Sequence, residues 1–250
     1  MLNNFELEKI INNILTPEKY SDGTVNGLQI QGKDTIKKIV TGVTASQELI
    51  DYAISVQADA ILVHHGYFWK NLDPRITGYH YQRIKKIIKN DLNLLAYHLP
   101  LDFNLQFGNN VELAKLFNLP NYFYTDKSAE ILVCQYDSPV EIQKFVALVE
   151  EKLGKKVLHI GKNGKEKIQK VGICSGGGQT FIDKAYALGC DIYLSGEISE
   201  YTTHSAVEQG IHYIAMGHHD SERYGIKVLG EYLAQTYNLE VIFKDCPNPA

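Results

Sequence analysis

The fold of this chain is decided by the stretch Ile61-Leu62-Val63-His64-His65-Gly66-Tyr67-Phe68-Trp69. Its apolar start, together with Ala60, predicts a buried strand. That strand stops at two adjacent imidazoles, followed by a glycine and the only tryptophan of the chain. Residues 46–56 before it predict a helix with an apolar face and Ser46 as its N-cap. A helix followed by a buried strand indicates an α/β unit, in which ligand sites gather beyond the carboxyl ends of strands.

Two further segments have the same character. Ala96-Tyr97-His98-Leu99-Pro100-Leu101-Asp102 follows a predicted strand over 92–97. Ile214-Ala215-Met216-Gly217-His218-His219-Asp220-Ser221-Glu222 ends another apolar run and leads into a predicted helix. We interpret the three strand ends as the sources of ligands for one metal site.

The order of elements predicts an α/β fold of two lobes with mixed or mostly parallel sheets. We place the N-terminal lobe at residues 1–125 and the C-terminal lobe at 126–250, with a C-terminal segment able to pack onto the first lobe. An internal echo supports two similar halves, because Asp51 and Asp59 recur as Asp183 and Asp191, 132 residues later. Lys156–Ile160 and Lys167–Cys174 read as a hairpin around Asn163-Gly164.

Composition bounds the class of protein. A chain of 250 residues with 44% apolar and 22% charged residues is ordinary for a globular protein. A net charge of −4 argues against general nucleic-acid binding. The four cysteines form no Cys-x-x-Cys pair, and the N-terminus does not resemble a signal peptide. We therefore expect a cytoplasmic protein with reduced thiols.

The candidate ligands are imidazoles and carboxylates without a thiolate, a set that suits Zn, Fe(II), Mn or a similar divalent ion. His218 and Glu222 are four residues apart and share one side of the predicted helix. Since one metal needs three or four protein ligands, five good candidates indicate two divalent ions with a shared carboxylate. Glu222 is the best bridge because its longer side chain can offer one oxygen to each ion. A lone histidine near a strand end is usually structural, and we interpret His80, His159 and His212 in that way.

These motifs in combination resemble the Nif-three-like dinuclear metal-centre family, whose members are often labelled GTP cyclohydrolase I type 2 homologues. The resemblance rests on Val63-His64-His65-Gly66, on Tyr97–Asp102 with Gly108-Asn109-Asn110, and on Gly217–Glu222. Asn26-Gly27-Leu28, and Gly196-Glu197 with His204, resemble further blocks.

The resemblance implies a toroidal homohexamer with two metals in a cleft between the lobes of each subunit. It implies metal ligands at His64, His65, Asp102, His218 and Glu222, with Glu222 touching both ions. His219 stands where the family usually has an aromatic residue and is a rival to His218. Glu197 stands where Asp is more usual. His98 is interpreted as a proton-transfer or supporting group, with a structural role as the alternative.

The pair His64-His65 has a geometric consequence. Adjacent residues on a strand point to opposite faces, so both could not serve one ion if the strand continued. Gly66 lets the chain turn, and two metals let each histidine face its own ion. We therefore interpret the pair as the divider of a dinuclear site.

Two other features have alternative interpretations. Ser175-Gly176-Gly177-Gly178 can cradle a phosphate, but it matches no nucleotide signature, and a tight turn is the favoured interpretation. Seven lysines between Lys152 and Lys170 form either a solvated surface, which we favour, or an anion-binding patch.

Two functions from different classes follow. The first is a metal-dependent hydrolase acting on a nucleotide or a phosphoester, for which the family label suggests ring opening of GTP. The alternative is a non-catalytic hexameric metal-binding assembly that acts as a carrier or partner platform. Binding of nucleic acid through the lysines is a weaker third idea.

Overall fold

The structure is a computed structural model that describes residues 2–126 and 128–250. The chain divides into two compact units. The first unit takes the chain up to Phe107 and again over Gly225–Pro247, and the second takes Gly108–Tyr224 and Asn248–Ala250. Sequence patterns alone place residues 108–125 in the N-terminal lobe. They belong to the second unit because Val111, Phe117 and Leu119 lie in its core.

The first unit contains a five-stranded sheet in the order β13-β4-β5-β6-β2. Strands β13, β4, β5 and β6 run parallel, and β2 closes one edge antiparallel to β6. The sheet strands are β2 (Gly27–Ile30), β4 (Lys38–Thr44), β5 (Ala60–His65), β6 (Asn93–Ala96) and β13 (Glu240–Phe243). A small ladder pairs β1 (Leu2–Asn3) with β3 (Thr35–Ile36). The helices are α1 (Asn4–Leu15), η1 (Pro17–Lys19), α2 (Gln47–Ser55), α3 (Gly78–Lys89), α4 (Leu99–Asp102) and the later part of α9 (His218–Tyr237).

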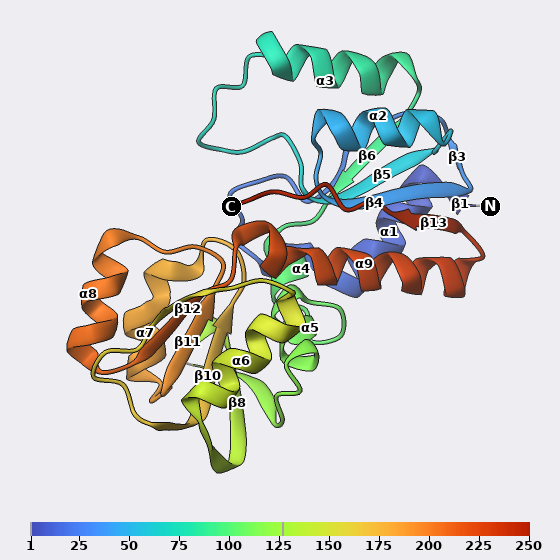
Figure 1. Cartoon of the computed structure of the whole chain (residues 1–250). Coiled ribbons are helices and arrows are strands. Elements are labelled where there is room, and N and C mark those ends of the chain that lie inside the picture. The colour runs from blue at the N-terminus through green and yellow to red at the C-terminus, as the bar shows by residue number, and fades with distance from the viewer. Residues whose placement is uncertain (1, 127) are drawn as a thin grey trace. The chain divides into compact units, whose positions relative to one another are not determined.

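Helices cover both faces of this sheet (Figure 1). Helix α1 and the later part of α9 pack on the face that carries Leu62 and Leu95, whereas α2 and α3 pack on the face that carries Ile61 and Val63. Helix α1 buries Leu7, Ile11 and Leu15 along one face. It begins where the Asn3 side chain accepts from backbone N–H groups in a capping box completed by Glu6. The side chains of β5 therefore contribute to two hydrophobic cores, one on each face of the sheet.

The second unit contains a six-stranded sheet in the order β7-β8-β10-β11-β12-β9. Strands β10, β11 and β12 are parallel, and the pairs β7–β8, β8–β10 and β12–β9 are antiparallel. The strands are β7 (Tyr122–Thr125), β8 (Ser128–Glu141), β9 (Leu158–Ile160), β10 (Lys167–Cys174), β11 (Ile192–Ser195) and β12 (His212–Ala215). The helices are α5 (Asn109–Leu116), α6 (Ile142–Leu153), η2 (Gly178–Phe181), α7 (Ile182–Ala187), α8 (Glu200–Gln209) and the first turns of α9.

The predicted hairpin between residues 156 and 174 was wrong in its pairing. The chain turns with Asn163 in the left-handed region (φ 66°), as the Asn-Gly signal suggested, but β9 pairs with β12 and not with β10. Strand β10 instead pairs with β8 and β11, which offer it longer ladders.

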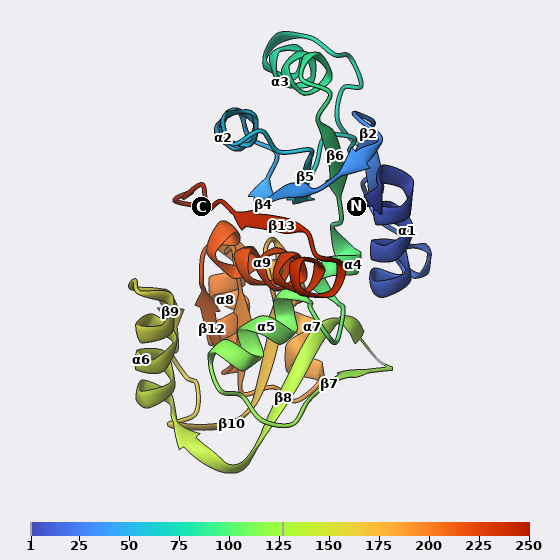
Figure 2. The same cartoon turned by 90° about the vertical axis from the view of Figure 1, so that its right-hand side faces the viewer.

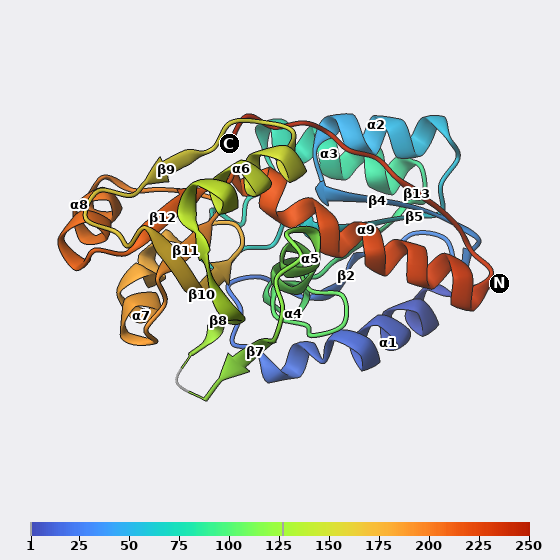
Figure 3. The same ribbon diagram turned by 60° about the horizontal axis from the view of Figure 1, so that its bottom comes forward.

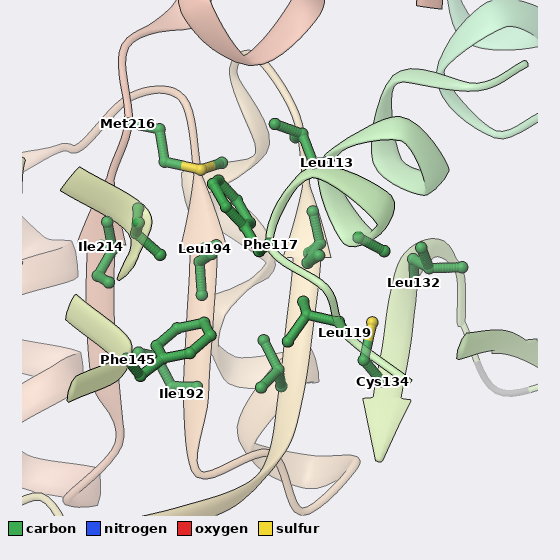
Figure 4. Close-up of a cluster of buried hydrophobic side chains, with 14 of the residues drawn as sticks. Leu113, Phe117, Leu119, Leu132, Cys134, Phe145, Ile192, Leu194, Ile214 and Met216 are labelled. Carbon is green, nitrogen blue, oxygen red and sulfur yellow. The ribbon is translucent and has the colours of Figure 1, made fainter. Parts of the chain in front are cut away.

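The core of the second unit lies between its sheet and helices α5 and α6 (Figure 4). Leu113 and Phe117 come from the α5 segment and Phe145 from α6, and they pack against Ile192 and Leu194 of β11. Helices α7 and α8 pack against the opposite face of the sheet (Figures 2 and 3). This unit is therefore also a three-layer α/β structure.

The internal echo corresponds to repeated architecture. In each unit a helix and its following strand, α2–β5 and α7–β11, lie within a run of three parallel strands. The carboxyl ends of these parallel strands fall at one edge of each sheet, where ligand sites are expected. None of the helices in the described part of the chain is both long and apolar enough to cross a membrane.

Candidate metal centre

The first unit gathers three imidazoles at the carboxyl edge of its sheet. His64 and His65 are the last residues of β5, which is longer than the sequence predicted, and His98 follows β6. One ring nitrogen from each lies within 4.8 Å of the others. Asp102, at the end of α4, lies beside them with its Oδ1 3.5 Å from Nε2 of His64. Four of the residues singled out from sequence thus meet within one unit.

The rings of His64 and His65 come close together, although adjacent side chains on a strand start toward opposite faces of the sheet. Their centroids are 4.5 Å apart, and the ring planes are inclined by 41°. His64 is fully buried, and its Nδ1 lies 2.9 Å from the carbonyl oxygen of Tyr97, which can only accept. Nδ1 of His64 therefore carries the proton, and Nε2 is the atom left to face Asp102. Nδ1 of His65 is 3.2 Å from Oγ1 of Thr44.

His98 is held by a residue that the sequence did not single out. Its Nδ1 donates to Oδ1 of Asp22 over 2.8 Å. Burial opposes the charge on this carboxyl, but hydrogen bonds from His98, Asn26 and Leu99 and the charge of His98 lower its pKa to about 2. No local pattern predicts the contacts of Asp22 with His98 and Leu99, because these partners are 76 and 77 residues away in the chain.

Within the second unit, side chains from the start of α9 and from the loops after β10 and β11 also form a cluster. Nε2 of His218 lies 3.0 Å from Oε2 of Glu222, and Nδ1 lies 2.7 Å from Oε1 of Glu197. Burial disfavours the charged ring, but the hydrogen bonds and charges of Glu222 and Glu197 outweigh it and raise the pKa of His218 to about 9. The four-residue spacing thus places the His218 and Glu222 side chains in contact, as the sequence predicted.

The glycine loop makes room for this cluster. Gly176 has φ +59°, and a Cβ atom there would lie 1.9 Å from Oε1 of Glu222 and 3.1 Å from Nε2 of His218. The Gly176 N–H donates to Oγ of Ser221 over 2.9 Å. The loop is thus a tight turn shaped around a carboxylate, which favours that interpretation over a phosphate cradle.

The imidazoles of His64, His65 and His98 in the first unit lie close enough together to hold a divalent metal ion. Metal-binding histidines commonly use their second ring nitrogen to bond a carboxylate or a carbonyl, which fixes the first nitrogen toward the ion. His64, His98 and His218 have Nδ1 bonded in this way, whereas Nδ1 of His65 lies 3.2 Å from the hydroxyl oxygen of Thr44.

The remaining candidates have other surroundings. His219 is buried, and its backbone N–H donates to Ala250. His204 lies at the surface 3.0 Å from Glu200 of the same helix. His159 and His212 share a 3.1 Å hydrogen bond. His80 packs its ring against Tyr67 and Tyr79, while Lys155, Lys156 and Lys165 of the basic segment form ion pairs with Asp220, Glu150 and Asp191.

The chain is similar in sequence and in structure to known proteins. A model of the Duf34/NIF3 (NGG1p interacting factor 3) family matches residues 3–249. A Haemophilus influenzae protein called GTP cyclohydrolase 1 type 2 homolog is 52% identical over 251 residues, covering 100% of both chains. The solved structure of a protein named ybgI is 46% identical with a TM-score of 0.96, and one from Thermus thermophilus is 28% identical with a TM-score of 0.90. Each of these structures covers 100% of both chains.

Proposed function

The chain belongs to the Duf34/NIF3 family, and we propose that it is a dinuclear metal-binding protein that acts as a metal-dependent hydrolase. In this proposal the cluster of the first unit and the cluster of the second unit supply ligands to one centre in a cleft between the lobes. His64, His65, Asp102, His218 and Glu222 would be the ligands, and Glu222 would bridge two divalent ions such as Zn, Fe or Mn.

One observation carries this proposal. The Glu222 carboxylate lies against Nε2 of His218 in a hollow that exists only because residue 176 is a glycine. A side chain that only capped a helix would not require a neighbouring backbone to lack its Cβ atom. The Nδ1 anchors of His64 and His218 add the outer hydrogen bonds that orient imidazole ligands.

The arrangement of the histidine ligands favours two ions over one. His64 and His65 come from alternating positions of β5, and their Nδ1 atoms are anchored on different partners, Tyr97 and Thr44. Each ring can therefore serve a different ion. Two divalent ions, when bound, lower the pKa of a water molecule and polarise a phosphoryl or ring carbon–nitrogen centre. Asp102 and Glu222 supply the negative charge that offsets two cations.

The proposed substrates are nucleotides and phosphoesters. The name of the relatives points to GTP, while phosphoester cleavage fits the same pair of ions. The test is purified protein loaded with Zn, Fe(II) or Mn and assayed against GTP and a phosphoester panel. We expect turnover that Glu222→Gln reduces at least about 100-fold, the scale of a lost catalytic electrostatic contact. Turnover indifferent to Glu222→Gln would contradict the assignment of the site.

A second candidate function is a homohexameric metal-binding assembly without catalysis, serving as a carrier or partner platform. Exposed apolar side chains on and near α3 favour association, since Ile76, Tyr79, Tyr81 and Ile88 are 42–64% exposed. Native mass spectrometry should give a particle six times the mass of the 28.2 kDa chain. Freely exchanging metal without turnover would favour this function over hydrolysis.

A further inference from the structure

Asp22 lies in the loop between η1 and β2, and it is buried. Its side chain is 3% exposed. Oδ1 accepts from Nδ1 of His98 over 2.8 Å, and Oδ2 accepts from Nδ2 of Asn26 over 2.9 Å and from the backbone N–H of Leu99 over 3.0 Å. Three donors surround a group that can only accept when ionised, so the carboxylate is held as an anion by a dedicated set of contacts.

The ring of His98 is fixed from several sides. Its backbone N–H donates to Oδ1 of Asn26 over 2.8 Å. The Trp69 ring meets it edge-on with the centroids 4.9 Å apart, and the His64 ring lies 5.1 Å away on centroids. The Asp22 contact then sets the rotation of the ring, because it pins one particular nitrogen. His98 thus belongs to the same cluster as His64 and His65 while its outer contact is a carboxylate.

The outer contacts within this cluster differ in kind. The Nδ1 atoms of His64 and His65 meet a carbonyl and a hydroxyl, which are neutral groups. Nδ1 of His98 meets an anion, and a carboxylate contact makes the other nitrogen of an imidazole a stronger acceptor. A carboxylate also cannot donate, so it excludes the tautomer in which Nδ1 lacks a proton.

From this arrangement we propose that Asp22 is a positioning residue that fixes His98 as its Nδ1–H tautomer and thereby presents Nε2 to the His64–His65 cluster. The group received there is an O–H donor, either a water molecule or a hydroxyl of the substrate. This inference rests on the proposed function for the identity of that donor. The tautomer itself does not depend on catalysis.

The test is a long-range ¹⁵N–¹H correlation spectrum of the metal-free full chain labelled in histidine, recorded where the rings are neutral. We expect the His98 signals to show Nδ1 protonated and Nε2 unprotonated. Asp22→Asn keeps the shape of the side chain but brings an amide that can donate to Nδ1. The population of the Nε2–H tautomer should then rise at least about tenfold, the ratio expected when a charge-assisted hydrogen bond is lost.

Asn26→Ala is the control, because it removes the Asn26 contacts to Oδ2 of Asp22 and to the His98 backbone N–H but leaves the carboxylate against Nδ1 of His98 in place. It should keep the wild-type tautomer. If Asp22→Asn does not fold, the wild-type spectrum alone decides, because Nε2–H in the wild type overturns the proposal.

The metal content of His98→Gln separates an O–H acceptor from a metal ligand. We expect Zn²⁺ affinity within about threefold of wild type, whereas a loss of two orders of magnitude would make His98 a ligand and overturn the inference. A protein without any turnover would contradict the proposed hydrolase and would leave the tautomer result standing, so the two failures can be told apart.

Discussion

Gly176→Ala should separate metal binding from folding, because the new methyl group enters the space that Glu222 occupies. The Cβ atom would lie 1.9 Å from Oε1 and 2.8 Å from Cδ of that carboxylate. Ordinary contact needs about 3.5 Å, so the carboxylate must move by roughly 1.5 Å. Metal–ligand distances tolerate only about 0.2 Å, so the displaced oxygen cannot keep its place in a coordination sphere.

The expected magnitudes follow from this displacement. The affinity for Zn²⁺ should fall at least about 100-fold, which is roughly 2.8 kcal/mol. The backbone of residue 176 is left-handed, with φ +59°, so alanine there should also lower the free energy of unfolding of the metal-free protein by about 1–2 kcal/mol. Competition with a chelator of known affinity measures the first quantity, and urea unfolding in excess chelator measures the second.

Gly177→Ala is the matched control for this experiment. A Cβ atom at Gly177 would find its nearest atoms at 3.8–4.0 Å, and its φ is −79°. This variant should keep wild-type affinity within about threefold. Equal Zn²⁺ affinities of Gly176→Ala and Gly177→Ala would contradict the prediction, because the position of Glu222 beside Gly176 would then not matter for metal binding.

Three other predictions concern single positions. His218→Asn should lower metal affinity by about two orders of magnitude, whereas His219→Asn should not, and elemental analysis of both variants decides between these rivals. Burial and the charge of His212 lower the pKa of His159 below 6.5. The unfolded chain therefore binds this proton more readily, so the contribution of His159 to the free energy of unfolding is complete above pH 6.5 and is lost as the pH falls toward the pKa of the folded state. Urea unfolding at pH 7.5 and 5.5 should therefore show a smaller loss in His159→Gln than in wild type; an equal loss would assign the pH dependence elsewhere. Leu194→Ala should cost about 2–5 kcal/mol of unfolding free energy because Leu194 is fully buried, and a cost below 1 kcal/mol would contradict the close packing of that core.

Local patterns were sufficient to predict the parts of this fold that depend on local physics. The apolar face of residues 46–56 predicted α2, and the apolar run before His64 predicted β5, because a buried face imposes its period on the sequence. The spacing of His218 and Glu222 predicted their contact because both lie on one helix. These predictions needed no knowledge of distant segments.

Contacts between distant segments explain what the sequence left out. The pairing of β9 with β12 joins residues about 55 positions apart, whereas the Asn-Gly signal reports only on the turn itself. Asp22 and Glu197 hold the histidines through partners 76 and 21 positions away. The sequence marks Gly176 as part of a glycine loop, but the requirement for glycine there comes from Glu222, whose carboxylate occupies the space of a Cβ atom.

The central claim is that His64, His65, Asp102, His218 and Glu222 bind two metal ions in one centre. Element-specific anomalous diffraction from crystals of the metal-loaded protein tests it most directly, because one data set gives the identity, number and ligands of the ions. The account predicts two anomalous peaks about 3.5–4 Å apart, with Glu222 touching both. A single peak, or peaks whose ligands come from only one unit, would contradict it.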